Sequence, residues 1–325
     1  MAAGGIGAVL HTGADATVKV IPNSVAVIDP GSNKLVGDIP VGREPSTVAA
    51  AGEHVWVGNR RDRNLTRIDP DGQRRWSAVN IPLDAPPAAL IAGPNAAWVV
   101  TAGSRLRLAR FDPRYDEPIE DVGIGAELST SKAGPAIWGG GLVRTPLAFG
   151  DGTIWTLGGL GGSLTRRDPT TLVPHGSVEL GDFATAIAAG LDAIWVTTRY
   201  NGLLRIDPDT NDIVDSFRFS ARAVPVDVAV GAHAVWIVSE GDDVVTRINP
   251  TTLERTPIRV GDEPTAIAYG FDSVWVACKG DGTVWRIDPA TPPKVVAHWK
   301  LGASPEDIAA GAGAVWTAVY SKLES

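Results

Sequence analysis

Residues 55–70 read VWVGNRRDRNLTRIDP, and residues 274–290 read VWVACKGDGTVWRIDPA. Each stretch has an apolar run around a Trp, a polar loop, and a second run that ends in Arg-Ile-Asp-Pro. Alternating β-branched and aromatic residues, bounded by Gly, Asp and Pro, predict short strands joined by tight turns. Both stretches therefore predict the same pair of neighbouring strands, used more than once.

This unit recurs along almost the whole chain. Successive repeat Trp residues are 42, 57, 40, 41, 39 and 41 positions apart, and they are Trp56, Trp98, Trp155, Trp195, Trp236, Trp275 and Trp316. A second motif, Asp-Pro or Asn-Pro, begins at Asp29, Asp69, Asp112, Asp168, Asp207, Asn249 and Asp288. Four short runs separated by turn signals, in a repeat of about 40 residues, are typical of a β-propeller blade.

The two ends of the chain each carry half a unit. Residues 24–41 match only the third and fourth strands of the repeat, whereas residues 304–320 match only the first and second. The two halves together complete one blade, and closing the ring removes the exposed sheet edges. We therefore expect an all-β seven-bladed β-propeller with four antiparallel strands per blade, closed by a two-plus-two clasp of the N- and C-terminal strands.

The composition is that of a protein with a large hydrophobic core, and it argues against nucleic acid and anionic membranes as partners. The chain has 325 residues, is 44% hydrophobic and carries a formal charge of −8. An acidic protein is a poor partner for nucleic acid or for an anionic membrane surface. Cys278 is the single Cys, so the sequence predicts neither an intrachain disulfide nor a cysteine metal cluster. We expect no cofactor.

The repeat also defines the expected domain boundaries. One propeller domain is expected over residues 23–321, with tails at residues 1–22 and 322–325. The first tail begins MAAGGIGAVLH, which lacks the basic region of a signal peptide and is too short to span a bilayer. It fits the trimmed end of a membrane anchor, which would be the protein's contact with a membrane.

The repeats resemble a known family. The two stretches quoted above, together with TRINPTTLERTPIRVGDEPTAIAYG at residues 246–270, look like YVTN-type propeller repeats and are similar to the virginiamycin B lyase-like group of seven-bladed propellers. The resemblance covers residues 24–320 and implies the fold. It does not by itself imply a function, because such repeats occur in binding modules, sensor domains and a few enzymes. It does imply a location outside the cytoplasm.

Resemblance to the lyase of that group would imply a magnesium-assisted elimination with a His base on the loop face. The five His residues do not match this requirement. His54 and His233 lie in the turn between the first and second strands, which opens on the opposite face. His175 follows an Asp-Pro turn, His298 lies in an outer strand and His11 lies in the tail. The resemblance therefore does not carry the lyase activity over to this chain.

Residues that recur in every blade are expected to serve the blade. The repeat Trp rings should fill the space between blades, each burying about 150–250 Å²; an aromatic cage for a ligand is the alternative. The Arg two positions before the Asp-Pro motif is predicted to be an inter-blade hydrogen-bond donor rather than a phosphate clamp, and occurs as Arg67, Arg110, Arg166, Arg205, Arg247 and Arg286. The Asp-Pro motifs predict turns, with calcium binding as the alternative.

Residues that break the repeat are the candidate site. The loops from the second to the third strand, and from the fourth strand to the next blade, share one face of a propeller, which we call the loop face. The candidates on this face are Arg60, Arg63, Arg105, Trp138, Arg144, Arg199, Tyr200, Asp227, Glu240, Lys279 and Asp307. Their mixed charges predict contact with a small polar ligand or a charged protein surface; a solvated loop rim is the alternative.

Trp138 and Arg144 lie in the largest departure from the repeat. The spacing of 57 residues between Trp98 and Trp155 places an insertion near residues 122–145, in a loop that projects onto the same face. An insertion of this length is uncommon without a role or disorder. A Trp flanked by Gly residues suits a lid or a contact with a ligand or partner. The alternative is that Trp138 plugs the central opening.

Together these features favour a non-enzymatic propeller that binds a ligand or a protein on its loop face, as an extracytoplasmic sensor or recognition module. The alternative from another class is a lyase or hydrolase assisted by Mg or Ca. It would work through carboxylates at the channel mouth, namely Asp227, Asp307 or Glu240. A structural scaffold without a small-molecule site is a third possibility.

Overall fold

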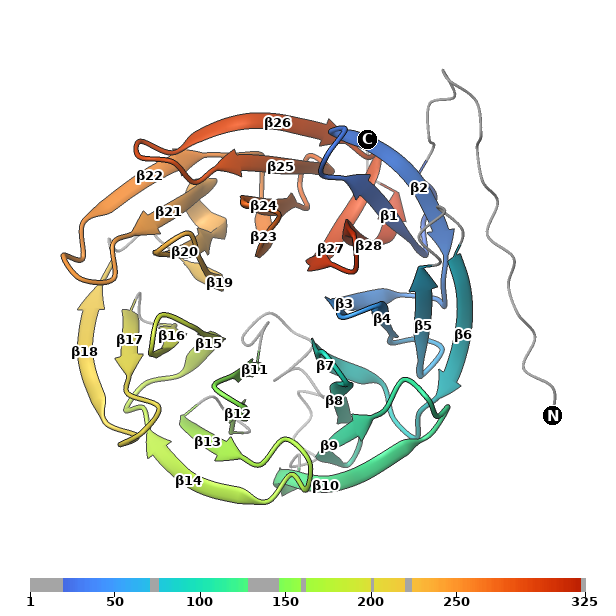
Figure 1. Ribbon diagram of the computed structural model, residues 1–325, viewed down its shortest axis with the longest axis horizontal. Coiled ribbons are helices and arrows are strands. Elements are labelled where there is room, and N and C mark those ends of the chain that lie inside the picture. Colours follow the sequence, from blue (N-terminus) through green and yellow to red (C-terminus); the bar gives the residue numbers. More distant parts are fainter. Residues whose placement is uncertain are drawn as a thin grey trace.

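The computed structural model describes residues 20–70, 76–127, 146–158, 162–199, 202–219 and 224–322. They form seven four-stranded sheets arranged as blades around a central axis (Figure 1). The predicted seven-bladed β-propeller is thus confirmed. Within these ranges the helical structure is one 3₁₀ turn, η1 (Glu240–Asp242), so no described helix has the length and apolar character needed to cross a membrane.

Each blade has four antiparallel strands, and the blades are numbered from the first that is continuous in sequence. Blades 1 to 3 consist of β3 (Pro45–Ala51), β4 (His54–Asn59), β5 (Asn64–Pro70) and β6 (Trp76–Pro82); β7 (Pro87–Gly93), β8 (Ala96–Ala102), β9 (Arg105–Phe111) and β10 (Pro118–Glu127); and β11 (Leu147–Gly150), β12 (Thr153–Leu157), β13 (Ser163–Arg167) and β14 (Pro174–Glu179). Blades 4 to 6 consist of β15 (Ala184–Ala189), β16 (Ile194–Thr198), β17 (Gly202–Ile206) and β18 (Ile213–Arg218); β19 (Pro225–Gly231), β20 (Ala234–Ser239), β21 (Val244–Ile248) and β22 (Arg255–Arg259); and β23 (Pro264–Gly270), β24 (Ser273–Cys278), β25 (Thr283–Asp288) and β26 (Lys294–Lys300).

Blade 7 joins the two ends of the described chain. Its strand order is β2 (Lys34–Pro40), β1 (Ser24–Asp29), β28 (Ala314–Lys322) and β27 (Ala303–Gly311). β1 pairs with β28 in antiparallel register from Ser24 opposite Val319 to Ile28 opposite Val315. The two-plus-two clasp predicted from the half-repeats is therefore confirmed, and the ring closes through backbone hydrogen bonds.

The repeat Trp residues form the packing layer between blades, as predicted. All seven lie in the second strand of their blade, and none is more than 4% exposed. In blades 4 to 7 the indole N–H also donates to the carbonyl oxygen of the Gly five residues earlier, at distances of 2.8–3.1 Å. The Gly residue of the repeat therefore provides the acceptor that a buried indole N–H requires.

The repeat Arg lies directly across from the Trp on the third strand. Trp56, for example, pairs with Arg67, and Trp275 with Arg286. In five blades the guanidinium carbon lies 4.9–6.0 Å from the centre of the Trp ring, within the range of a cation–π contact. Blade 7 has no repeat Arg, because Val27 takes the position opposite Trp316.

Each blade also forms a side-chain hydrogen bond with the backbone of the next blade. Three of these bonds run from the repeat Arg to the Pro carbonyl of the next Asp-Pro turn, which confirms the predicted inter-blade donor. In ring order the seven bonds are Arg67 Nη1 to Pro113 O (2.6 Å), Trp98 Nε1 to Pro169 O (2.9 Å), Arg166 Nη1 to Pro208 O (2.8 Å), Thr185 Oγ1 to Pro225 O (3.0 Å), Ile267 N to Asp227 Oδ2 (2.9 Å), Arg286 Nη1 to Pro30 O (2.8 Å) and Val48 N to Asp307 Oδ2 (2.8 Å).

The Asp-Pro motifs form turns between the third and fourth strands. Asp168 Oδ1 accepts hydrogen bonds from the backbone N–H groups of Thr170 and Thr171 at 2.9 and 2.7 Å. These backbone donors, Thr171 first, hold the pKa of Asp168 below its ordinary value, because they stabilise the ionised carboxylate. The same pattern is seen at Asp207 and Asn249, which supports the predicted turns.

We expect Arg286→Ala to lower the free energy of unfolding by about 1.5–3 kcal/mol, the range for hydrogen bonds to a charged group. The substitution removes the bonds from Nη1 to Pro30 O and Asn33 Oδ1 and a third bond from Nε to Ser273 Oγ at 2.9 Å. Arg286→Lys should recover only part of the loss, because an ammonium group lacks the planar fork. Urea unfolding of the full chain measures both effects.

Arg107→Ala is the matched control. Arg107 lies on a third strand too, but its guanidinium pairs with Asp121 at the surface, so its loss should cost about 0–1 kcal/mol. If Arg286→Ala and Arg107→Ala shift the urea midpoint equally, the repeat Arg does not stabilise the contact between blades.

Candidate functional site

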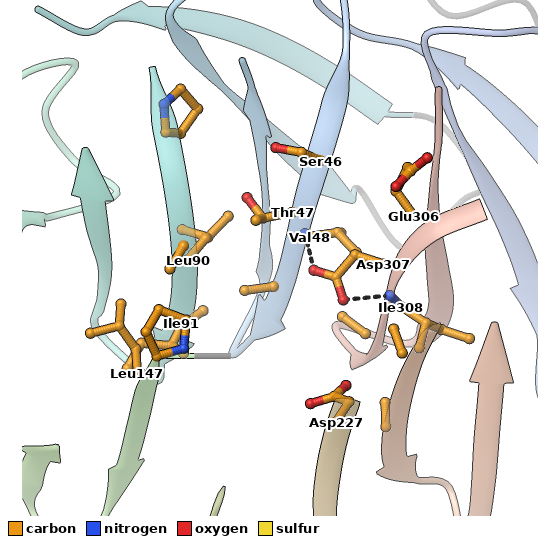
Figure 2. A pocket seen from close by; sticks show the side chains of 18 of the residues that line it. Ser46, Thr47, Val48, Leu90, Ile91, Leu147, Asp227, Glu306, Asp307 and Ile308 are labelled. Atoms are coloured by element: carbon orange, nitrogen blue, oxygen red, sulfur yellow. Dashed lines mark hydrogen bonds between the residues drawn. The ribbon is translucent and has the colours of Figure 1, made fainter. Parts of the chain in front are cut away.

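The first strands of the seven blades surround a central cavity of about 710 Å³. Figure 2 shows part of its wall, where Val48, Leu90, Leu147 and Ile308 present apolar side chains. This volume lies within the range of about 300–1,000 Å³ that is common for ligand pockets. The wall is largely apolar because successive residues of an inner strand point alternately toward the cavity and toward the blade core, and both environments favour small or aliphatic residues.

At the loop face, one position of the repeat forms a rim around the cavity. This rim position is four residues after the repeat Trp, and its backbone N–H donates to a carbonyl oxygen next to the start of the first strand. The bonds are Arg60 to Glu44 (2.9 Å), Ala102 to Pro86 (2.9 Å), Arg199 to Phe183 (2.8 Å), Glu240 to Val224 (3.1 Å) and Lys279 to Glu263 (2.8 Å). Tyr320 occupies the rim position of blade 7. The rim therefore combines a repeated backbone with side chains that differ in charge and size.

Two ion pairs lie at the rim on blades 6, 7 and 1. Lys279 Nζ is 2.7 Å from Glu306 Oε1, which joins blade 6 to the first strand of blade 7. Arg60 Nη1 is 3.6 Å from Glu44 Oε1 within blade 1. The residues of both pairs line the cavity, and so does Tyr320. A polar ligand could therefore exchange its own groups for one member of either pair.

Asp227 and Asp307 also line the cavity, and both accept hydrogen bonds from backbone N–H groups. They occupy equivalent positions on the first strands of blades 5 and 7. Asp307 accepts from Ile308 N at 2.8 Å and from Val48 N of blade 1 at 2.8 Å (Figure 2). Asp227 accepts from Val228 N and from Ile267 N of blade 6, both at 2.9 Å. Both carboxylates thus join neighbouring inner strands.

The sequence candidates fall into three groups, according to where they lie relative to the cavity. Arg60, Lys279, Asp227 and Asp307 line it together. The remaining described candidates lie on the loop face or at the ends of its loops, outside the lining: Arg63, Arg105, Arg199 and Glu240. Trp138, Arg144 and Tyr200 lie outside the described residues.

Three residues of the rim were not among the sequence candidates, namely Glu44, Glu306 and Tyr320. Tyr320 could have been found by comparing the residue four positions after each repeat Trp, since no other blade has an aromatic residue there in the sequence. Glu306 directly follows Pro305 of the first strand, and after the equivalent Pro other blades carry Ser46, Ala88 or Thr265. Comparing repeats position by position would thus have identified both.

The described residues of the cavity do not fit a divalent cation. No group of three or more His, Cys, Asp or Glu side chains in the described ranges is placed to hold a metal ion. Asp227 and Asp307 use carboxylate oxygens on backbone N–H groups. Nor does the described lining contain a His residue. Cys278 is buried, which raises the pKa of its thiol to about 12 and disfavours the nucleophilic thiolate.

Fold and rim together define a seven-bladed propeller with an apolar central cavity and a charged mouth. The chain is similar to a streptogramin B lyase structure (TM-score 0.67, 18% identity, covering 92% of this chain and 95% of that chain). It is also similar to a chain of a mitotic checkpoint complex (0.66, 11%, 97% and 100%) and to BamB from Moraxella catarrhalis (0.57, 13%, 92% and 95%). The virginiamycin B lyase-like resemblance is therefore confirmed for the fold. No protein-family model and no curated protein matches the sequence.

We expect Asp307→Ala to lower the free energy of unfolding by about 1–3 kcal/mol, because the N–H of Val48 would lose its acceptor. Asp307→Asn keeps one oxygen acceptor and should cost less. The urea midpoints of the two variants, compared with the unsubstituted chain, measure the difference. If Asp307→Ala unfolds at the unsubstituted midpoint, the carboxylate does not join blades 7 and 1.

Proposed function

We propose that the chain is a non-enzymatic binding module that takes a small polar ligand or a protein surface on its loop face, over the mouth of the central cavity. The observation that carries this proposal is the rim, where a repeated backbone bond presents Arg60, Ala102, Arg199, Glu240, Lys279 and Tyr320. A residue that serves only the blade would be repeated, as the Trp is. Side chains that differ in charge and size at one repeated position are typical of a surface that binds another molecule.

The charge distribution supports a polar partner. Blade 1 carries Arg60 and Arg63 in its rim loop, whereas blade 5 carries Glu240 and Asp242 at the corresponding place. The two sectors face each other across the cavity. Opposite sectors of charge orient a partner and speed its association at low salt.

The proposal includes the candidates that lie outside the described residues. Trp138 and Arg144 belong to the loop that leads from blade 2 to blade 3, and Tyr200 directly follows the rim residue Arg199. We propose that they add contacts to the same bound molecule. The role as an extracytoplasmic sensor is also part of the proposal, and it rests on the family resemblance.

A metal-assisted lyase or hydrolase is the alternative, favoured by the fold shared with a streptogramin B lyase structure. The known proteins of this fold also include a chain of a mitotic checkpoint complex, so the fold is compatible with both roles. The backbone bonds of Asp227 and Asp307 favour binding over metal chemistry, because ligation would compete with contacts between blades.

A thermal-shift screen with a panel of polar metabolites and charged peptides tests the proposal. A compound present at 100 times its dissociation constant should stabilise the chain by about 2.7 kcal/mol. Arg60→Ala combined with Lys279→Ala should reduce the shift given by the same compound, and so should Trp138→Ala with Arg144→Ala. Arg107→Ala, on the outer part of blade 2, is the matched control.

Two results would contradict the proposal. One is that compounds which stabilise the chain do so equally in the rim double variant. The other is stabilisation by magnesium, calcium or manganese that is lost in Asp227→Asn, which would instead support the metal-assisted alternative.

A further inference from the structure

A second hollow lies beside blade 5, outside the central cavity. It is a groove of about 400 Å³ between blades 4 and 5. Phe219, which follows β18 of blade 4, lines one side. The other side comes from blade 5, through Ser239, Asp242, Val244, Thr246, Arg255, Pro257 and Arg259. None of these residues lines the central cavity.

Comparison with blade 6 shows what could fill this groove. Thr246 lies ten residues after the repeat Trp236, and Trp285 lies ten residues after the repeat Trp275. The two residues are also equivalent in the sheets, since Thr246 pairs with Pro257 and Trp285 pairs with His298. Blade 6 therefore places an indole ring where blade 5 places a hydroxyl and a methyl group.

In blade 6 that indole fills the space beside the preceding blade. Trp285 packs against a core cluster that includes Ile258 and Val260 of blade 5, and it stacks on His298 with ring centres 4.8 Å apart. Its indole N–H donates to Thr283 Oγ1 at 2.7 Å. The fold thus accepts an indole at this position, and the groove between blades 4 and 5 lacks one because of Thr246.

The groove also has aromatic and cationic walls. Phe217 and Phe219 lie edge to face, with ring centres 5.7 Å apart, and the guanidinium carbon of Arg255 is 5.2 Å from the centre of each ring. Arg259 lies four residues further along β22 and lines the same groove. Among the described residues that line the groove, two guanidinium groups and one carboxylate, that of Asp242, leave an excess of positive charge.

We infer that the groove between blades 4 and 5 binds a flat aromatic carboxylate the size of an indole acid. The ring would take the space that Trp285 fills in blade 6, between Phe219 and the Thr246–Pro257 pair. The carboxylate would bind the guanidinium group of Arg259, whose planar fork matches a carboxylate in two parallel hydrogen bonds, while the guanidinium group of Arg255 lies over the two Phe rings. The groove shares no lining residue with the central cavity, so it constitutes a second binding site on the protein.

Isothermal titration calorimetry of the full chain with indole-3-acetate tests the inference. We expect saturable binding, and about tenfold weaker binding of the neutral analogue tryptophol, because it lacks the carboxylate. Thr246→Trp should abolish the binding by filling the groove with the chain's own indole. Thr165→Trp is the matched control, because Thr165 is the equivalent residue of blade 3 and its substitution should leave the affinity unchanged.

Arg259→Gln should weaken the binding of indole-3-acetate about tenfold and leave that of tryptophol unchanged. The rim variant Arg60→Ala with Lys279→Ala should bind indole-3-acetate normally, so that failure of the groove and failure of the rim are distinguishable. The inference is overturned if indole-3-acetate gives no saturable heat, if Thr246→Trp binds it as well as the unsubstituted chain, or if tryptophol binds equally.

Discussion

Contact between adjacent blades is the constraint on which this structure depends. A single four-stranded sheet cannot bury both of its faces, so each blade is stable only against its neighbours. The repeat Trp provides the apolar part of that contact in all seven blades. The directional part is a side-chain hydrogen bond to the backbone of the next blade, and each of the seven contacts has one.

The Trp is repeated without change, whereas the hydrogen bond is formed by different residue types. Arg67, Arg166 and Arg286 donate to a Pro carbonyl of the following turn. At the contact between blades 7 and 1, Val27 stands in the Arg position, and Asp307 accepts from the inner strand instead. Apolar packing requires a shape that few side chains supply, but a backbone donor or acceptor can be satisfied by any suitably placed polar group. The residue that forms the hydrogen bond can therefore differ from blade to blade, whereas the Trp that packs between blades does not.

The fold was predictable because its determinants are local and repeated. The Trp and Asp-Pro motifs define blade number, and the half-repeats at the ends define the clasp between β1 and β28. The candidate site was predictable only in part. The structure brings Arg60, Lys279, Asp227 and Asp307 to the lining of one cavity, and their role in binding stays a prediction. The bonds of Asp227 and Asp307 to the neighbouring inner strand were not predicted, because sequence does not show which side of a strand offers an unpaired backbone N–H.

A departure from the repeat can thus have two physical causes, and the partner of the side chain distinguishes them. When the departing residue bonds the neighbouring backbone, as Asp307 does, it replaces a stabilising contact that the repeat provides elsewhere. When it fills space, as Trp285 does in blade 6, it adds packing that blade 5 lacks, because blade 5 carries Thr246 at the equivalent position, as blades 1 and 3 carry Thr66 and Thr165. An unfilled space beside apolar side chains lowers stability. The aromatic carboxylate that we infer would supply, beside Thr246, the packing that Trp285 supplies in blade 6.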